Sequence, residues 1–241
     1  SPSDNLFLSA SFDSTIRIYR LPNFTFALNF SDNRDCVNDA KFIADDKIIS
    51  CSRDQTIKLY DVTKASLIKS FTSSSMPLSL TYSQSQVVSG HYDGKLRIWD
   101  FRSPSAPVEI RAHKDIIIQC QSKTNSSNIV SLGQDKAIVV SDIRNPRDPF
   151  KGSINISKSG IPSEHMQMAL TDDFVYVGGS DGQLYEYSME TWKYHNSRKG
   201  HEAPVFCVAA KPSLGIMASG DRVGKVLFWK KDVKSPQFAS E

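Results

Sequence analysis

Histidines are the side chains of this sequence most able to bind a metal or move a proton, so their spacing is considered first. The five histidines are His91, His113, His165, His195 and His201. None has the His-x-x-x-His spacing of a helical zinc site, and none stands beside a cysteine or an acid at ligand spacing. The histidines therefore predict no metal site, and we expect no cofactor.

The four cysteines could form disulfides or bind zinc, but their positions favour neither. They are Cys36, Cys51, Cys120 and Cys207, widely spaced, with no Cys-x-x-Cys pair and with small or apolar neighbours. This pattern predicts buried free thiols in a reducing compartment. The chain starts with Ser1-Pro-Ser-Asp4, which is no signal peptide, so we expect a cytoplasmic protein.

Acidic pairs and nucleophile motifs complete the search for catalytic chemistry. Asp45-Asp46 and Asp172-Asp173 are interpreted as solvated β-turns, with calcium ligation as the alternative. No strand–Gly-x-Ser-x-Gly–helix elbow is present, and the segment from Gly90 to Lys95 lacks the spacing of a phosphate-binding loop. The sequence therefore predicts no catalytic residues and a protein that is not an enzyme.

Composition bounds the class of protein. The chain has 241 residues, of which 39% are hydrophobic, enough for a well-buried core in one large or two small domains. Its formal charge of +3 is too small to argue for a nucleic-acid partner. No segment approaches 18 apolar residues, so we expect no direct membrane insertion.

One segment recurs six times and dictates the elements that position every other feature. In most copies a Ser is followed four residues later by an Asp, and then by two aliphatic residues in alternation and an aromatic residue. The aromatic position is filled by Tyr19, Tyr60, Trp99, Ser141, Tyr187 and Trp229, which gives spacings of 41, 39, 42, 46 and 42 residues. A constant period near 40 residues indicates a repeat architecture.

Each copy has the pattern of a β-hairpin. Alternation such as Ile57 and Leu59 puts aliphatic side chains on one face of a strand, and Lys58 between them on the other. The Asp lies in the turn before that strand, where its carboxylate can accept hydrogen bonds from turn amides. These turn residues are Asp13, Asp54, Asp93, Asp135 and Asp181. In the sixth copy Val223 takes this position, and Asp221 falls two residues early.

The period, the turn Asp and the Trp99-Asp100 pair together resemble the WD40 family. That resemblance implies an all-β fold, the WD40 β-propeller, with four strands in each blade. Another all-β repeat or a sandwich is the alternative. We expect innermost strands near residues 37–42, 77–82, 116–120, 166–170 and 205–209, and outermost strands near 24–30, 67–71, 108–111, 154–156 and 193–195.

The repeats fall short of a complete ring at this period. About five and a half blades are visible of an expected seven, with at least one blade missing before residue 1. A six-bladed ring closed by irregular means is the alternative. The domain is expected to span residues 1–230, followed by a polar tail at 231–241.

Within the WD40 class, two segments resemble the carboxy-terminal propeller of the autophagy-related 16-like proteins. They are residues 41–61, with Thr56-Ile-Lys-Leu-Tyr-Asp61, and residues 88–103, with Leu96-Arg-Ile-Trp-Asp-Phe-Arg-Ser103. The resemblance implies a non-catalytic adaptor that binds membrane-associated proteins or short peptide motifs, including membrane-protein tails. Such an adaptor recruits a lipid-conjugation complex to autophagic or endolysosomal membranes. The chain departs from the family pattern at Ser141, Tyr187-Ser188 and Trp229-Lys230.

His113 and His201 precede expected innermost strands, where WD40 repeats place a structural histidine. From each histidine the turn position of the Asp lies 22 residues on, at Asp135 and at Val223. We therefore expect a structural Asp–His–Ser hydrogen-bond network, with a catalytic triad as the alternative.

A binding surface is expected where the turns between middle strands and the links into innermost strands meet, because function concentrates on loops held by rigid sheets. Phe12, Arg53 and Tyr92 precede the turn Asp on successive blades and should form one arc of side-chain types common in binding hot spots. Packing against neighbouring turns is the structural alternative for each of them. The remaining candidates are Gln134, Arg34, Asp35, Lys114, Asp115, Glu164 and Glu202.

Two other propeller functions have weaker support in the sequence. Trp99-Asp-Phe-Arg102 and Ser141-Asp-Ile-Arg144 resemble the Trp-Asp-x-Arg motif of substrate receptors of cullin-type ubiquitin ligases, although such an arginine often only caps a strand end. A phosphoinositide-binding propeller would carry Phe-Arg-Arg-Gly, and the segment Asp100–Ser103 lacks the second arginine and the glycine. A generic WD40 scaffold is the remaining alternative.

Overall fold

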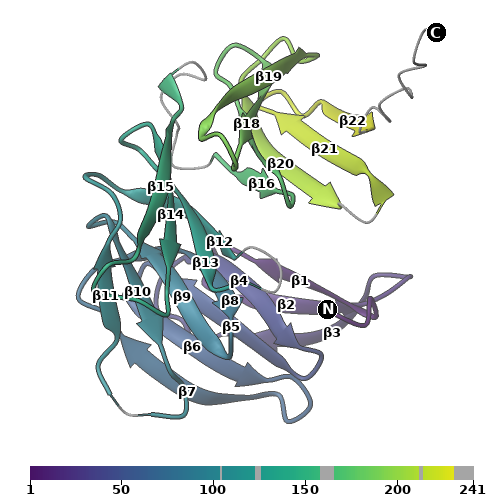
Figure 1. Ribbon diagram of the computed structural model, residues 1–241. Coiled ribbons are helices and arrows are strands. Elements are labelled where there is room, and N and C mark those ends of the chain that lie inside the picture. Colours follow the sequence, from purple (N-terminus) through teal and green to yellow (C-terminus); the bar gives the residue numbers. More distant parts are fainter. Residues whose placement is uncertain (104, 123–125, 158–165, 212–213, 231–241) are drawn as a thin grey trace, which may run out of the picture. The chain divides into compact units, whose positions relative to one another are not determined.

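The computed structural model describes residues 1–103, 105–122, 126–157, 166–211 and 214–230. These residues form two compact units, one running from Ser1 to Ser157 and one covering residues 166–230. Both units consist of antiparallel β-sheets joined by turns and short links (Figure 1). The all-β class predicted from the repeat is therefore confirmed.

The first unit contains four sheets that follow one another along the chain. The first sheet has three strands, and the next three have four strands each. In order the strands are β1 (Leu6–Ala10), β2 (Ile16–Arg20), β3 (Thr25–Phe30); β4 (Val37–Ala44), β5 (Lys47–Ser52), β6 (Thr56–Asp61), β7 (Ser66–Thr72); β8 (Pro77–Ser83), β9 (Gln86–His91), β10 (Lys95–Trp99), β11 (Val108–Arg111); β12 (Ile117–Ser122), β13 (Asn128–Gly133), β14 (Ala137–Asp142) and β15 (Phe150–Asn155).

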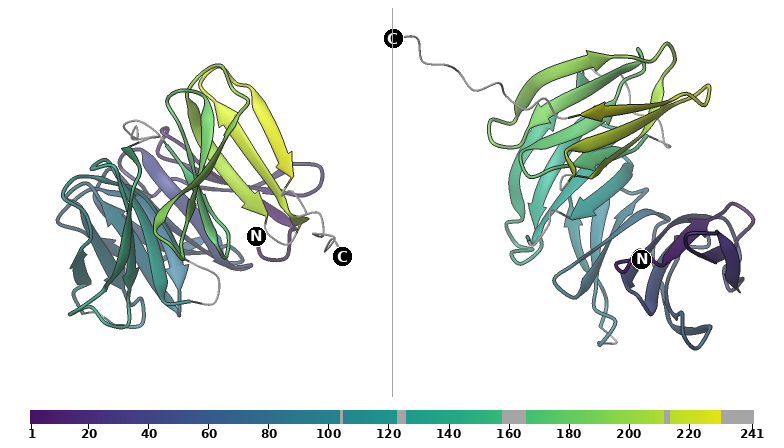
Figure 2. Two further views of the ribbon diagram at one scale, coloured as in Figure 1. Left: turned by 45° about the horizontal axis from the view of Figure 1, so that its top comes forward. Right: turned by 90° about the vertical axis from the view of Figure 1, so that its right-hand side faces the viewer.

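The second unit contains two sheets of the same type, seen from two further sides in Figure 2. The first has four strands, β16 (Met168–Leu170), β17 (Phe174–Gly178), β18 (Gln183–Ser188) and β19 (Lys193–Lys199). The second has three, β20 (Val205–Lys211), β21 (Ile216–Asp221) and β22 (Val226–Lys230). The sheets of both units are β-propeller blades, because each is an antiparallel meander; the four complete ones run from an innermost to an outermost strand, the first sheet lacks an innermost strand and the last lacks an outermost one.

Each repeat forms its hairpin for a local reason. In the hairpin of β5 and β6, Cys51 pairs with Ile57, and the chain reverses between them. The residue after the Asp position of the repeat, which Val223 fills in the last blade, adopts a positive φ in every blade, and these residues are Ser14, Gln55, Gly94, Lys136, Gly182 and Gly224. Such a conformation closes a tight turn, and Asp accepts the turn amides that would otherwise lack a partner.

The hydrophobic core lies between neighbouring blades. Ile16 and Ile18 of β2 pack with Ile48 of β5 and Tyr60 of β6. The same kind of layer joins the second blade to the third and the third to the fourth in the first unit. A separate layer in the second unit joins its two blades. The aliphatic positions of the repeat are therefore what holds consecutive blades together.

The expected strands are confirmed, and two other expectations, the number of blades and the burial of the cysteines, are corrected. The innermost strands β4, β8, β12, β16 and β20 and the outermost strands β3, β7, β11, β15 and β19 all overlap their predicted ranges. The described residues form six blades, the first and last with three strands each, which agrees with the five and a half blades expected to be visible and differs from the expected total of seven. All four thiols are free, but only Cys51 and Cys120 are buried, while Cys207 is exposed. The predicted tail at 231–241 lies outside the described residues.

Candidate protein-binding surface

The turn Asp of each blade organises the loops around it. Asp54 shows the arrangement, because its carboxylate accepts hydrogen bonds from the Thr56 amide at 2.9 Å, the Arg34 amide at 2.9 Å and the Lys58 ammonium at 3.2 Å. The carboxylates of Asp13, Asp93, Asp135 and Asp181 each accept the amide two residues on in the same way. These bonds fix the turn between the middle strands and, through Arg34, tie it to the link before the innermost strand.

A cation four residues after the turn Asp completes the arrangement in three blades. Arg97 is almost fully buried and donates to the Asp93 carboxylate at 2.7 Å, to Glu109 at 2.7 Å and to the Ser74 hydroxyl at 3.0 Å. Lys58 occupies the same position beside Asp54 and is also buried. Charges buried in this way are tolerated only when paired, so these cations rigidify the turns rather than face a ligand.

The pKa values of the turn carboxylates report these bonds. Burial raises the pKa of Asp54, but the Arg34 amide, Thr56 and Lys58 outweigh it and bring the pKa to about 2. For Asp93, burial is likewise outweighed by the Arg97 guanidinium, and its pKa falls below the usual range. Both carboxylates are therefore ionised at neutral pH and permanently engaged.

Histidine replaces the cation as partner of the turn carboxylate in two blades. His113 Nδ1 lies 2.9 Å from Asp135 Oδ1, and its Nε2 lies 2.9 Å from the Ser131 hydroxyl. In the last blade His201 makes the same bonds to Asp221 at 2.8 Å and to the Ser219 hydroxyl at 2.7 Å. Asp221 also accepts the amides of Val223 and Lys225, so it acts as the turn Asp although it lies two residues early.

These Asp–His–Ser arrangements have the connectivity of a catalytic triad, but their serines are sealed inside the blades. Ser131 is fully buried and bonds the Val139 carbonyl at 3.3 Å. Ser219 is buried too, and its hydroxyl oxygen accepts the Trp229 indole N–H at 2.8 Å. A nucleophile must reach a reacting carbon, which a buried and fully bonded hydroxyl cannot do. The networks are structural, as the positions of the two histidines predicted.

The third blade holds a histidine network that the sequence did not reveal. His91 comes from strand β9 itself, with Nε2 2.6 Å from the Ser89 hydroxyl and Nδ1 2.9 Å from the Ser75 carbonyl. Its place in the repeat is taken by Gly133 in the next blade, where a Cβ would lie 2.2 Å from His113 Nδ1. A blade can therefore carry the imidazole ring either on its second strand, as at His91, or before its innermost strand, as at His113, but not at both positions.

The loop face of the first unit is the end of its blades formed by the turns at residues 11–15, 53–55, 92–94 and 134–136 and the links at 31–36, 73–76 and 112–116. One backbone bond repeats along it. The amides of Arg53, Tyr92 and Gln134 donate to the carbonyls of Cys36, Met76 and Ile116, at 2.9, 3.0 and 2.9 Å. Each bond anchors the first residue of a turn to the residue before the innermost strand, so these side chains occupy equivalent positions.

Phe12 and Arg53 form a contact between neighbouring blades on this face. The Arg53 guanidinium carbon lies 5.2 Å from the centroid of the Phe12 ring, a cation–π geometry. Phe12 is 62% exposed, Tyr92 one blade further is 50% exposed, and Arg53 is exposed. Arginine and aromatic side chains fixed by their backbone but open to solvent are typical of binding hot spots.

The links contribute alternating charges to the loop face. Arg34-Asp35 and Lys114-Asp115 occupy equivalent places in two links, and all four side chains are exposed. The basic residue donates its amide to a turn Asp, at 2.9 Å for Arg34 and 3.0 Å for Lys114. The Asp115 carboxylate accepts the amide of the next residue. The cationic side chains take no part in these bonds and extend from a fixed backbone.

The structure brings together most of the sequence-predicted set but not all of it. The residues from Phe12 to Gln134 lie on the loop face of the first unit, with Gln134 only partly exposed. Glu202 is exposed in the second unit, and Glu164 lies outside the described residues. Sequence reasoning missed Arg222, whose amide donates to the Pro204 carbonyl at 2.9 Å as Arg53 does to Cys36. Its position before Val223, the residue at the Asp position of the repeat, could have revealed it.

The arginines of the Trp-Asp-x-Arg motifs lie at the other end of the strands. Arg102 donates two hydrogen bonds of 2.9 Å to Asp100, and Arg144 pairs with Asp142 in the same way. The side chains are 72% and 66% exposed. The Arg102 guanidinium lowers the pKa of Asp100 to about 2, and Asp142 lies 3.9 Å from Lys151 in addition to its pair with Arg144. Both arginines are therefore engaged in ion pairs at a strand end.

Part of the chain matches a protein-family model. The model described as "WD domain, G-beta repeat" matches residues 1–20, 24–61 and 66–100. The first three blades are WD40 repeats. Each matched segment ends at or next to the last residue of the third strand of a WD40 blade, where the repeat of this sequence has its aromatic residue.

Similar proteins include several of the autophagy-related type. The chain is 26% identical to Autophagy-related protein 16 of Arabidopsis thaliana over 80% of its length, and 24% identical to Autophagic-related protein 16.2 of Caenorhabditis elegans over 92%. It is also 30% identical to the Ribosome biogenesis protein WDR12 homolog of Culex quinquefasciatus over 57% of its length. The matched regions cover 38%, 43% and 34% of these relatives, so the chain corresponds to under half of each.

Solved structures support the fold. The computationally designed Ika8 protein superposes with a TM-score of 0.72, covering 94% of this chain and 68% of that one, at 21% identity. Among the described residues no group of three or more potential ligands could hold a metal ion. No helix in the described part of the chain is long and apolar enough to cross a membrane.

Proposed function

We propose that this chain is the WD40 interaction module of an autophagy-type adaptor, which binds short segments of membrane-associated proteins at its loop face. The observation that carries the proposal is the exposed Phe12–Arg53 pair, held by the backbone bonds of its turns and continued by Tyr92. A pre-positioned arginine and two aromatic rings reduce the entropy that binding costs. WD40 scaffolds bind other proteins through such loops.

The similarity to autophagy-related 16 proteins supports the finer part of the proposal. The match to the Caenorhabditis elegans protein extends over both units of the chain. Recruitment of a lipid-conjugation complex, and a cytoplasmic location from which the adaptor is drawn to autophagic or endolysosomal membranes, follow from that resemblance. The proposed partners are protein segments, including membrane-protein tails, and no nucleic acid.

Proximity labelling in cells tests the proposal with matched variants. The wild-type chain is expected to label membrane-associated proteins of the autophagy machinery, and Arg53→Ala or Tyr92→Ala to lose most of that labelling. Arg144→Ala, which removes an exposed arginine at the other end of the strands, is the control and should label like the wild type. Unchanged labelling by both loop-face variants would contradict the proposal.

The same experiment weighs the ubiquitin-ligase alternative. A substrate receptor would label a ligase adaptor, and Arg102→Ala would remove that signal. The ion pairs of Arg102 with Asp100 and Arg144 with Asp142 favour strand capping over a free recognition arginine. We therefore expect no ligase adaptor among the labelled proteins.

A further inference from the structure

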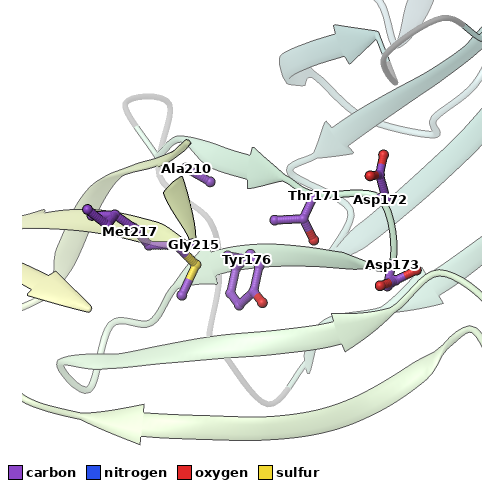
Figure 3. Close-up of a pocket in the computed structure, with 8 residues that line it drawn as sticks. Thr171, Asp172, Asp173, Tyr176, Ala210, Gly215 and Met217 are labelled. Atoms are coloured by element: carbon purple, nitrogen blue, oxygen red, sulfur yellow. The ribbon is translucent and has the colours of Figure 1, made fainter. Parts of the chain in front are cut away.

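A cavity in the second unit lies away from the turn between β17 and β18, at the opposite end of the strands. It measures about 130 Å³ and is lined by residues of both blades of the unit. Thr171, Asp172 and Asp173 form the turn between β16 and β17, and Gly215 begins the segment that enters β21. In Figure 3 these two sets lie on opposite sides of the Tyr176 ring.

The inner wall of this cavity is apolar. Tyr176 and Met217 are almost fully buried and belong to the core layer between the two blades, with Ala210 packed against it. The Tyr176 hydroxyl donates to the Glu186 carboxylate at 3.3 Å, so the phenol is already satisfied. The wall therefore offers contact surface for methylene groups and no free polar partner for a ligand among these three side chains.

The rim of the cavity is acidic, and its carboxylates are unused. Asp172 and Asp173 are exposed, and neither carboxylate has a hydrogen bond or an ion pair to a described residue. The matched pair in the second blade differs, because Asp45 accepts the Ser3 amide at 2.9 Å and Asp46 pairs with Lys47. The same dipeptide in the same kind of turn is thus occupied in one unit and available in the other.

Size and charge together select one kind of occupant. A cavity of about 150 Å³ holds a benzene molecule, and drug-sized ligands need about 300 Å³ or more, so this one fits a single side chain. An apolar slot under a carboxylate rim suits a side chain with an unbranched hydrocarbon stem and a cationic tip. We propose that the cavity between β16–β17 and β20–β21 takes the side chain of a lysine on a partner protein.

This site is independent of the loop face, so it does not rest on the proposed function. It would give the module a second contact at the opposite end of the strands of the second unit. Two separated contacts on one partner raise avidity without further contacts at either site.

Nuclear magnetic resonance with methyl-labelled methionine tests the site on the whole chain. The probes are N-acetyl-lysine methylamide and N-acetyl-norleucine methylamide, which share the hydrocarbon stem but differ in charge. The lysine probe is expected to shift the Met217 methyl signal in a saturable way. The norleucine probe is expected to bind with an affinity at least about tenfold lower. No saturable shift, or equal binding of both probes, would overturn the proposal.

Substitutions distinguish the contribution of the acidic rim to lysine binding from that of the apolar wall. Asp172→Asn combined with Asp173→Asn should weaken lysine binding by about tenfold, while Asp45→Asn with Asp46→Asn should leave it unchanged. Ala210→Leu, which fills the cavity, should abolish the shift caused by either probe. If both double variants lost the same amount of lysine affinity, the effect would be one of overall charge, and the proposed site would be refuted. Thermal melting of each variant verifies that the blades are folded.

Discussion

At the residue scale, the blades are held by polar side chains that have no freedom left to act on a ligand. The Ser89 hydroxyl accepts the Trp99 indole N–H at 2.7 Å and lies 2.6 Å from His91 Nε2. Because the Ser75 carbonyl can only accept, the ring proton lies on Nδ1 and Nε2 accepts from Ser89. His91 is thus a neutral imidazole that fits its site only without a second proton.

The pH dependence of stability should reveal this neutral ring. Burial, with a smaller contribution from Arg97, lowers the pKa of His91 from 6.5 to about 4. Between these values the unfolded chain binds the proton and the folded chain does not, so stability falls as pH drops from about 6.5 to 4, by up to about 3 kcal/mol. Urea denaturation at several pH values measures this loss, which His91→Gln should reduce. An unchanged pH dependence in that variant would refute the assignment.

Removing the histidine of the last blade tests the structural role of its network. His201→Ala leaves the buried Asp221 and Ser219 without their imidazole partner, which should cost about 1–3 kcal/mol. His195→Ala, in the exposed strand β19, removes only a ring contact with Phe174 and should change stability by about 1 kcal/mol or less. Chemical denaturation compares the two. Similar effects of both substitutions would mean that the network contributes nothing specific.

At the element scale, the cation four residues after the turn Asp is buried in one blade and exposed in another. Arg97 lies beside Asp93 and Glu109 with its side chain 2% exposed, whereas Arg17 pairs with Asp13 at a side-chain exposure of 42%. The facing residue on the neighbouring strand also differs, since Arg97 pairs with the acidic Glu109 and Arg17 with the neutral Asn29. The same sequence pattern therefore gives a buried ion-pair network in one blade and a surface pair in another.

Alanine substitution at these two positions should have unequal effects. Arg97→Ala leaves the partly buried Asp93 carboxylate without its cation, while Glu109 keeps only Lys95, and should cost about 2 kcal/mol or more. Arg17→Ala breaks an exposed pair and should cost about 1 kcal/mol or less. Thermal or urea unfolding of both variants checks the ranking. A larger loss for Arg17→Ala would contradict the burial seen in the structure.

The sequence predicted the hairpins well because their causes are local. The alternation of aliphatic residues and the turn Asp lie within about a dozen residues of each other, and they located the strands. It did not predict that Asp221 serves as the turn Asp, because that depends on the Lys225 and Val223 amides, which the Asp221 carboxylate reaches from an earlier position in a turn of the usual length. Contacts such as Phe12 with Arg53 join residues 41 positions apart, and only the packing of blades brings them together.

At the scale of the whole molecule, the chain combines a rigid framework with loops open to solvent. The apolar layers between blades and the buried turn ion pairs fix the backbone, so exposed side chains on the loop face are held in place without being packed. Exposed side chains on a hydrogen-bonded backbone favour recognition of other proteins. The similarity to autophagy-related 16 proteins fits such a recognition module and concerns only part of those longer chains.

Affinity of a partner segment, measured beside thermal stability, tests this account most directly. A segment identified by proximity labelling would be titrated by calorimetry against the wild-type chain, Arg53→Ala and Arg144→Ala, with melting curves of each. We predict that Arg53→Ala weakens binding by about tenfold or more, since arginine hot spots are worth about 2 kcal/mol, with a nearly unchanged melting temperature. Arg144→Ala should match the wild type. Unchanged affinity of Arg53→Ala, or a loss of binding matched by an equal loss of melting temperature, would contradict the account.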